Sequence, residues 1–207
     1  MNYKNHWQQT KSSTIKMNDL REIFIKKILL QKEHYLKFCE ISQVKSYNKK
    51  EFILKENSIC SFIGFVENGT VRSYLLKEDK EYNNDFYFNN SFISAYRSFV
   101  TQTPAYSNIQ AMSQTTIRYI NFEQLKKLEN TSDAWHKLGK YIAEQFFIRK
   151  CTRETSFLIN SAKERYDLLI ESHPKIEQLI PQYAIASYLR IEPESLSRIK
   201  ALTYIKK

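Results

Sequence analysis

Glycine is scarce in this sequence, with only three among 207 residues. Loops that hold a phosphate with main-chain N–H groups need several closely spaced glycines, so a glycine-rich phosphate-binding loop is excluded. Cysteine is equally scarce, and its odd number argues against a disulfide framework. The three cysteines lack the C-x-x-C spacing of a zinc or iron–sulfur site, and we interpret them as small buried hydrophobic residues: Cys39, Cys60 and Cys151.

Histidine is rare too, and its spacing fits neither a metal site nor a catalytic triad: His6, His34, His136 and His173. The apolar runs are broken by polar residues well short of the roughly 18 residues that a membrane-spanning helix needs. The first sixteen residues carry three lysines and no acid, without the apolar segment of a signal peptide. We therefore expect a cytoplasmic protein with a flexible basic N-terminus over residues 1–17, in which Met17 is an alternative initiator.

Positive charge is what the chain has in excess, with a net charge of +10. Such an excess favours a polyanionic partner, of which nucleic acid is the commonest. The basic residues are spread along the chain rather than gathered in one segment, so charge alone does not identify the partner.

The hydrophobic pattern changes twice along the chain. Residues 18 to about 40 have apolar residues at helical spacing, which predicts amphipathic helices. Residues 41–122 hold six to eight short β-branched and aromatic segments, which predict an antiparallel roll or sandwich. Asn68-Gly69 between two of these segments predicts a β-hairpin with a two-residue turn. The helical period returns at residue 123 and predicts a short helix there.

A second, long helix is predicted from about residue 132 to 159. One stripe of this helix is apolar: Trp135, Leu138, Ile142 and Phe146. Such a stripe packs either against the predicted β-domain or against a second copy of the helix. Because a helix of about 28 residues is roughly 42 Å long, more than a small domain needs, we favour the second interpretation, a dimerisation helix.

The segment "IPQYAIASYLRIEPESLSRIK", residues 180–200, predicts two short helices joined by a tight turn. A helix-turn-helix needs a small residue at the helix crossing, an apolar residue in the turn and apolar residues inside its second helix. Those places hold Ala186, Ile191, Leu196 and Ile199, with Ile185 and Leu189 completing the core. Pro181 and Pro193 suit the first turn of a helix. A simple helical hairpin would have the same apolar spacing, but the polar outer face favours a DNA-reading module.

The predicted DNA-binding residues lie on that outer face and at the start of the first helix: Gln182, Tyr183, Glu194, Ser195, Ser197, Arg198 and Lys200. Arg198 can bind guanine in the major groove and Glu194 can accept a hydrogen bond from cytosine. The serines and Lys200 suit phosphate groups.

A β-roll, a long helix and a C-terminal helix-turn-helix resemble the family of the cyclic-AMP receptor protein and the fumarate-nitrate reduction regulator, abbreviated Crp/Fnr. The most specific parts are "SAKERYDLL" and the 180–200 segment, which look like the family's Bacteroidetes-type branch, as does "FVENGTVRSYLL". The resemblance implies an α+β fold: a cyclic-nucleotide-binding-like jelly roll with flanking helices (18–130), a dimerisation helix (131–159) and a winged-helix-type DNA-binding domain (160–207). It implies a homodimeric transcription regulator that binds a palindromic DNA site.

Three features depart from the family pattern. Arg190 stands where most relatives have the glycine of the turn, at a position usually in the left-handed region, which costs about 1 kcal/mol or more. Pro193 stands where some relatives have a DNA-contacting arginine. The chain ends at Lys207, so we expect little or no wing after the second helix.

A cyclic nucleotide is not expected to bind in the family's usual way. Family members that bind it use a glutamate on the ribose, and an arginine and a hydroxyl residue on the phosphate. Alignment places Ala95, Ala105 and Tyr106 at these positions. A buried cyclic phosphate needs a paired cation or several donors. Haem and iron–sulfur ligands of other members are also missing. Another small-molecule effector would contact Tyr96, Arg97, Ser107 and Asn108, although a filled roll that serves only as a scaffold is an equal alternative.

The sequence therefore predicts a DNA-binding regulator that is not an enzyme, uses no cofactor and has RNA polymerase and an unknown effector as further candidate partners. A cupin-type metalloenzyme is disfavoured because residues 41–122 contain no histidine. The remaining alternative is a ligand-binding β-roll or adaptor protein whose terminal helices bind protein rather than DNA.

Overall fold

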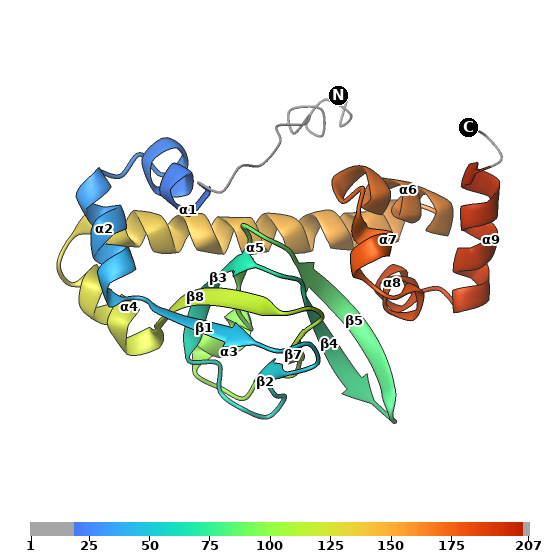
Figure 1. The fold of residues 1–207 in the computed structure, drawn as a ribbon, viewed down its shortest axis with the longest axis horizontal. Helices are drawn as coiled ribbons and strands as arrows, with labels where there is room; N and C mark the ends of the chain where they lie inside the picture. The colour runs from blue at the N-terminus through green and yellow to red at the C-terminus, as the bar shows by residue number, and fades with distance from the viewer. Residues whose placement is uncertain (1–18, 205–207) are drawn as a thin grey trace.

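The computed structural model describes residues 19–204, which form a β-roll, a long helix across it and a group of short helices at one end (Figure 1). The predicted basic segment 1–17, including Met17, lies outside the described residues. Three short helical elements precede the roll: α1 (Asp19–Glu22), the π-helical η3 (Ile23–Lys27) and α2 (Lys32–Ile41). They confirm the helices predicted for residues 18 to about 40. The fully buried ring of Phe24 joins them, because it lies 5.8 Å from the ring of Tyr35 and 5.3 Å from that of Phe38.

The roll consists of two four-stranded antiparallel sheets. One sheet has the order β1-β8-β3-β6 and the other β2-β7-β4-β5. The strands are β1 (Gln43–Tyr47), β2 (Phe52–Leu54), β3 (Phe62–Asn68), β4 (Val71–Lys77), β5 (Lys80–Tyr87), β6 (Phe92–Ile93), β7 (Asn108–Ala111) and β8 (Thr115–Asn121), with helix α3 (Tyr96–Thr101) between β6 and β7. The predicted antiparallel roll is confirmed.

The hairpin predicted at Asn68-Gly69 is wrong. The strands on either side, β3 and β4, belong to different sheets and do not pair, so the chain turns a corner there. Gly69 is nevertheless required: its φ is +112°, and a Cβ atom would lie 2.4 Å from Oγ1 of Thr115.

The two-residue hairpin lies one connection later, between β4 and β5. Lys77 pairs with Lys80, and the two central residues, Glu78 and Asp79, have φ values of +50° and +59°. Two successive positive φ values are those of a type I′ turn. The sequence did not reveal it because Glu-Asp lacks the usual Asn-Gly signature.

The long helix α5 (Asp133–Ile159) follows the short α4 (Phe122–Glu129) and runs across the roll (Figure 1). Its predicted dimer stripe requires a correction, because all four side chains are buried in the core that α5 shares with the roll and the N-terminal helices: Trp135, Leu138, Ile142 and Phe146. The stripe faces inward because the roll supplies the apolar surface that covers it. Large apolar residues on α5 are also exposed, including Phe147 and Leu158, at 70% and 79%.

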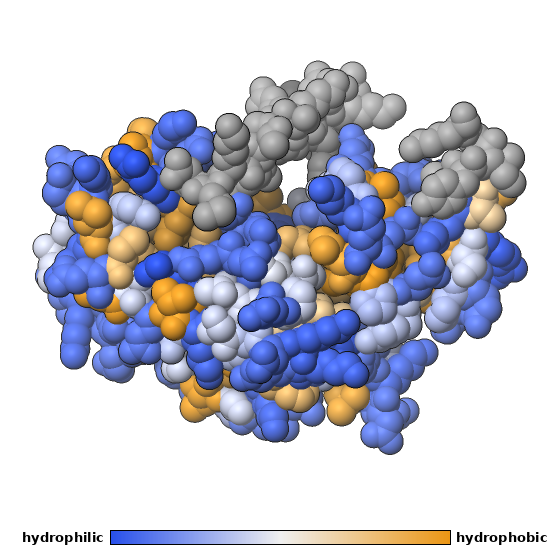
Figure 2. All heavy atoms as spheres, in the orientation of Figure 1, coloured by the Kyte–Doolittle hydropathy of each residue, from blue (hydrophilic) through white to orange (hydrophobic). Residues whose placement is uncertain are grey.

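Four helices follow α5 in the described part of the chain: α6 (Ala162–Ser172), α7 (Ile176–Leu179), α8 (Gln182–Leu189) and α9 (Pro193–Tyr204). They share one hydrophobic cluster with Phe86, which comes from strand β5 of the roll. Among residues 19–204, no helix combines the length and the apolar character needed to cross a bilayer. Hydrophilic side chains cover most of the face seen in Figure 2, with smaller apolar patches between them.

Candidate nucleic-acid interface

Helices α8 and α9 form the helix-turn-helix that the sequence predicts. Ala186 and Leu196 are each 1% exposed and lie in the same hydrophobic cluster as Ile185 and Leu189. Ile191 in the turn and Ile199 in α9 pack against that cluster. The small side chain of Ala186 lets the two helices approach, as the crossing of such a motif requires.

The turn between the helices contains a residue in the left-handed region. Arg190 has φ +54° and ψ +50°, and its N–H group binds the last turn of α8. Its guanidinium lies 4.5 Å from the centre of the Phe157 ring. Two further arginines donate hydrogen bonds to the carbonyl groups at the end of α8: Arg153 to Tyr188 at 2.9 Å and Arg165 to Leu189 at 3.2 Å. Cations at the carboxyl end of a helix stabilise it.

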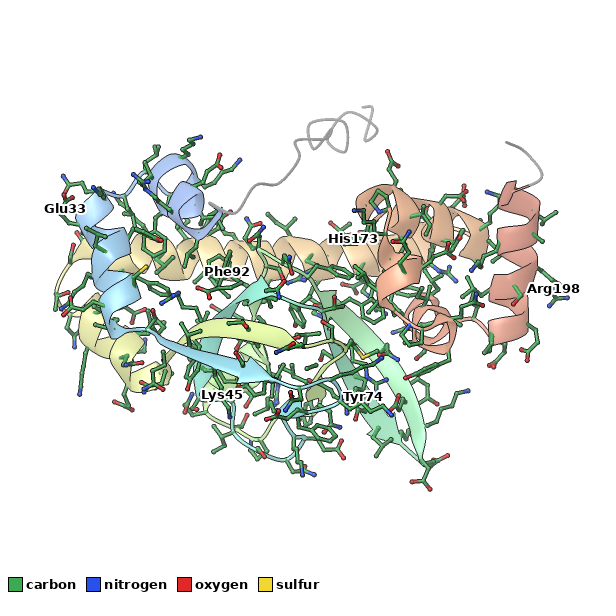
Figure 3. All side chains as sticks on the ribbon, viewed as in Figure 1. Glu33, Lys45, Tyr74, Phe92, His173 and Arg198 are labelled. Atoms are coloured by element: carbon green, nitrogen blue, oxygen red, sulfur yellow. The ribbon has the colours of Figure 1, made fainter. Side chains whose placement is uncertain are left out.

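The outer face of α9 is polar and exposed. Glu194, Ser197 and Arg198 all lie on it, and Arg198 points away from the molecule in Figure 3. Arg198 donates a weak hydrogen bond to Oγ of the half-buried Ser195, at 3.3 Å. The hydroxyl of Ser197 donates to the carbonyl of Pro193 one turn earlier. This face therefore presents a donor-rich arginine and a carboxylate to whatever approaches it.

The first turn of α8 is also exposed. It carries Gln182 and Tyr183, of which Tyr183 is 51% exposed. Both side chains are accessible from outside, which is compatible with the DNA contacts predicted for them.

Lys200 does not lie on the outer face of α9, contrary to the prediction. Its Nζ is 2.7 Å from Oε1 of Glu177 on α7, and its side chain is only 17% exposed. The reason is the helical period: Lys200 follows the buried Leu196 by four residues and shares its inner face. The ammonium group of Lys200 therefore pairs with a carboxylate of the same domain and does not face outward.

The helix-turn-helix is fixed to the β-roll through strand β5. The hydroxyl of Ser187 on α8 accepts a hydrogen bond from the N–H of Asn83 and donates one to the carbonyl of Glu81, each at 2.9 Å. The rings of Phe86 and Tyr188 lie 5.0 Å apart across the same contact. Strand β5 therefore connects the roll directly to the first helix of the motif.

A second candidate site is a cavity of about 730 Å³ between the roll and α5. The three positions aligned with nucleotide-binding residues all line it: Ala95, Ala105 and Tyr106. Tyr96, Arg97 and Ser107 also line it, as predicted for an effector pocket.

The prediction that Asn108 contacts an effector is wrong, because Asn108 is not among the residues that line this cavity. Its side chain is buried, and its Oδ1 accepts a hydrogen bond from the N–H of Glu56. Asn108 therefore ties the start of β7 to the turn that follows β2 rather than meeting a ligand.

Asp85 is a cavity residue that the sequence did not indicate. It is 3% exposed, and its carboxylate oxygens lie 3.4 Å from Nη1 of Arg149 and 3.5 Å from Nζ of Lys150. Burial and the charge of Asp85 raise the pKa of the neighbouring Tyr87 well above its ordinary value, so Tyr87 stays neutral. An acidic residue in an aromatic strand was the available signal, but only the fold places it against α5.

Comparison with known proteins agrees with this architecture. Residues 44–132 match the family model described as the cyclic nucleotide-binding domain. No curated protein sequence matches the chain significantly.

Solved structures with the same fold include FixK2 from Bradyrhizobium japonicum, with a TM-score of 0.69 at 17% identity, covering 80% of this chain and 86% of that one. A regulator assigned to the Crp/Fnr family from Eubacterium rectale has a TM-score of 0.64 at 16% identity, covering 86% and 85%. The c-di-GMP-responsive global regulator CLP of Xanthomonas campestris has a TM-score of 0.64 at 15% identity, covering 85% and 93%. At these identities the similarity shows a shared fold.

Proposed function

Because the chain has the fold of the Crp/Fnr regulators and a match to the cyclic nucleotide-binding domain, we propose that it is a sequence-specific DNA-binding transcription regulator. It acts by binding rather than by catalysis. The observation that carries the proposal is the exposed polar face of α9, with Glu194 and Arg198, on a helix whose opposite face is packed in the motif's core. In this class of motif the second helix enters the major groove, where arginine binds guanine and glutamate accepts from cytosine.

The regulator acts as a homodimer, and its dimer contact lies on the outer face of α5. Four large apolar side chains of α5 are exposed by 58–79%: Phe147, Ile148, Leu158 and Ile159. Exposed apolar surface of this kind marks a protein contact. The spacing of Phe147, Cys151 and Leu158 along the helix is that of a seam between two helices. Two copies of α9 related by a two-fold axis read two half-sites of a palindrome.

The roll does not bind cyclic AMP in the usual way. Ala95 and Ala105 supply methyl groups where a ribose and a phosphate need hydrogen-bonding partners. A buried phosphate without them costs several kcal/mol. Calorimetry of the purified protein with cyclic AMP is expected to give no micromolar binding, and micromolar binding would contradict this part of the proposal.

DNA binding is tested by selecting bound molecules from a pool of random duplex DNA at low salt. We expect a palindromic motif with half-site centres about 34 Å apart, one helical turn. The variant Arg198→Ala should lose the preference at one base position per half-site, because it removes a base contact without touching the buried core. Failure to enrich any sequence would contradict the proposal and favour the alternative in which the terminal helices bind protein.

A further inference from the structure

We propose that the cavity beside α5 binds a small, mainly apolar molecule whose head group donates a hydrogen bond to Asp85. The inference names the ligand class for the effector domain of the regulator proposed above. It rests on that proposed function, but the two can be tested separately because ligand binding is measured without DNA.

The size and walls of the cavity fit an apolar ligand. Its volume of about 730 Å³ lies within the range of roughly 300–1,000 Å³ typical of small-molecule sites. Aromatic rings form much of its wall, including Tyr96, Phe146 and Phe147. The small side chains of Ala95 and Ala105 leave the space that larger residues would fill.

Two residues that line the cavity have a buried acceptor oxygen that the protein does not satisfy, Asp85 and Asn84. Within residues 19–204, Oδ2 of Asp85 is buried and has no hydrogen-bond partner. Lys150 is its ion-pair partner at 3.5 Å, beyond the 2.7–3.2 Å of ordinary N–H···O hydrogen bonds. The ammonium of Lys150 belongs to a side chain that is 53% exposed, so solvent screens this ion pair. A ligand donor at Oδ2 would complete the hydrogen bonding of a buried carboxylate, which is costly to leave incomplete.

Direct contact with Oδ2 of Asp85 disfavours an anionic head group. Two acidic residues line it, Asp85 and Glu144. Of the two basic residues that line it, Lys150 is paired with Asp85, and Arg97 lies over the ring of Tyr106 at 4.4 Å. Arg149, which is not part of the lining, is paired with the other carboxylate oxygen of Asp85 at 3.4 Å. A ligand carboxylate near Oδ2 would meet a like charge in a buried setting, whereas an amine or hydroxyl would meet an acceptor.

Asp85 lies on the strand that contacts the DNA-reading motif. Its neighbours on β5, Asn83 and Phe86, contact Ser187 and Tyr188 of α8. A ligand head group at Asp85 therefore reaches the same strand that fixes the position of α8.

The test uses three probes with the same apolar body and different head groups: 3-phenylpropylamine, 3-phenylpropan-1-ol and 3-phenylpropanoate. Binding to the full chain is measured by calorimetry in the absence of DNA. The amine is expected to bind at least about tenfold more tightly than the carboxylate, with the alcohol between them, because a charge-assisted hydrogen bond is the strongest of the three. In Asp85→Asn the advantage of the amine is expected to fall to within about threefold.

A second variant tests the cavity independently, in case Asp85→Asn disturbs the fold. Ala143→Leu on α5 fills part of the cavity without altering its charges and is expected to weaken all three probes alike. Its matched control is Ala201→Leu on the exposed face of α9, which should change none of them. Equal binding of amine and carboxylate would overturn the proposal, as would no binding of any probe below about 1 mM. Amine binding by a protein that selects no DNA would support the cavity assignment and contradict only the proposed regulator function.

Discussion

Arg190 lets the strain in the DNA-reading motif be measured directly. The residue ends α8 in the left-handed region, with φ +54° and ψ +50°. Its side chain also makes a favourable contact, because the guanidinium lies 4.5 Å from the centre of the Phe157 ring. Replacing Arg190 by Ala removes the contact and keeps the strain, whereas replacing it by Gly removes both.

The expected magnitudes follow from these two effects. An exposed cation–π contact contributes about 0.5–1 kcal/mol, so Arg190→Ala should destabilise the protein by about that amount. The left-handed region costs a residue with a Cβ atom about 1–2 kcal/mol, part of which glycine loses again through its greater freedom in the unfolded chain. Arg190→Gly should therefore be about 1 kcal/mol more stable than Arg190→Ala and close to the wild type.

The assay is urea unfolding of the three proteins at one protein concentration, followed by circular dichroism. As a control, both Arg190 variants are also made in a protein that carries Phe157→Leu, which removes the ring. In that background Arg190→Ala should cost little, while the difference between the glycine and alanine variants should persist. If Arg190→Ala and Arg190→Gly are equally stable in both backgrounds, the turn stores no strain and the reasoning is refuted.

Three further predictions concern the contacts of α5, α9 and α8. Leu158→Glu should raise the dimer dissociation constant about 100-fold or more in sedimentation experiments, since each buried Leu contributes about 1.5–3 kcal/mol. Val100→Glu, at an exposed apolar position outside α5, should not raise it. Lys200→Ala should lower the free energy of unfolding by about 1 kcal/mol by removing the Glu177 ion pair. It should leave the salt dependence of DNA binding unchanged, whereas loss of a phosphate contact would reduce the slope by about 0.9. Ser187→Ala should speed hydrogen exchange of the β5 amide that it binds, and unchanged exchange would show that this contact does not hold α8.

Local sequence patterns predicted the helix-turn-helix because its determinants are local. Ala186, Leu196 and Ile199 lie close together in the sequence, and helical spacing alone places them on facing surfaces. The same period placed Lys200 correctly relative to Leu196, but its charge suggested an outward position. The partner that turns it inward, Glu177, belongs to another helix and is not visible in the periodicity.

Long-range packing explains the predictions that failed. Asn68-Gly69 has the local chemistry of a hairpin, but pairing with β8 and β6 rather than β4 assigns β3 to the other sheet. The inner stripe of α5, with Leu138 at its centre, is a good dimer seam by period alone, yet the roll covers it. The position of Asp85 in an aromatic strand was not enough to predict its role, because that role comes from the approach of α5 to β5.

The most direct test of DNA reading by paired copies of α9 is to repeat the DNA selection with Arg198→Ala and compare its motif with that of the wild type. One base position per half-site should lose its preference, at two places related by the two-fold symmetry of the site. The affinity for the wild-type site should fall by about 1–3 kcal/mol per lost contact. An unchanged motif, or a change at one unpaired position, would contradict the account.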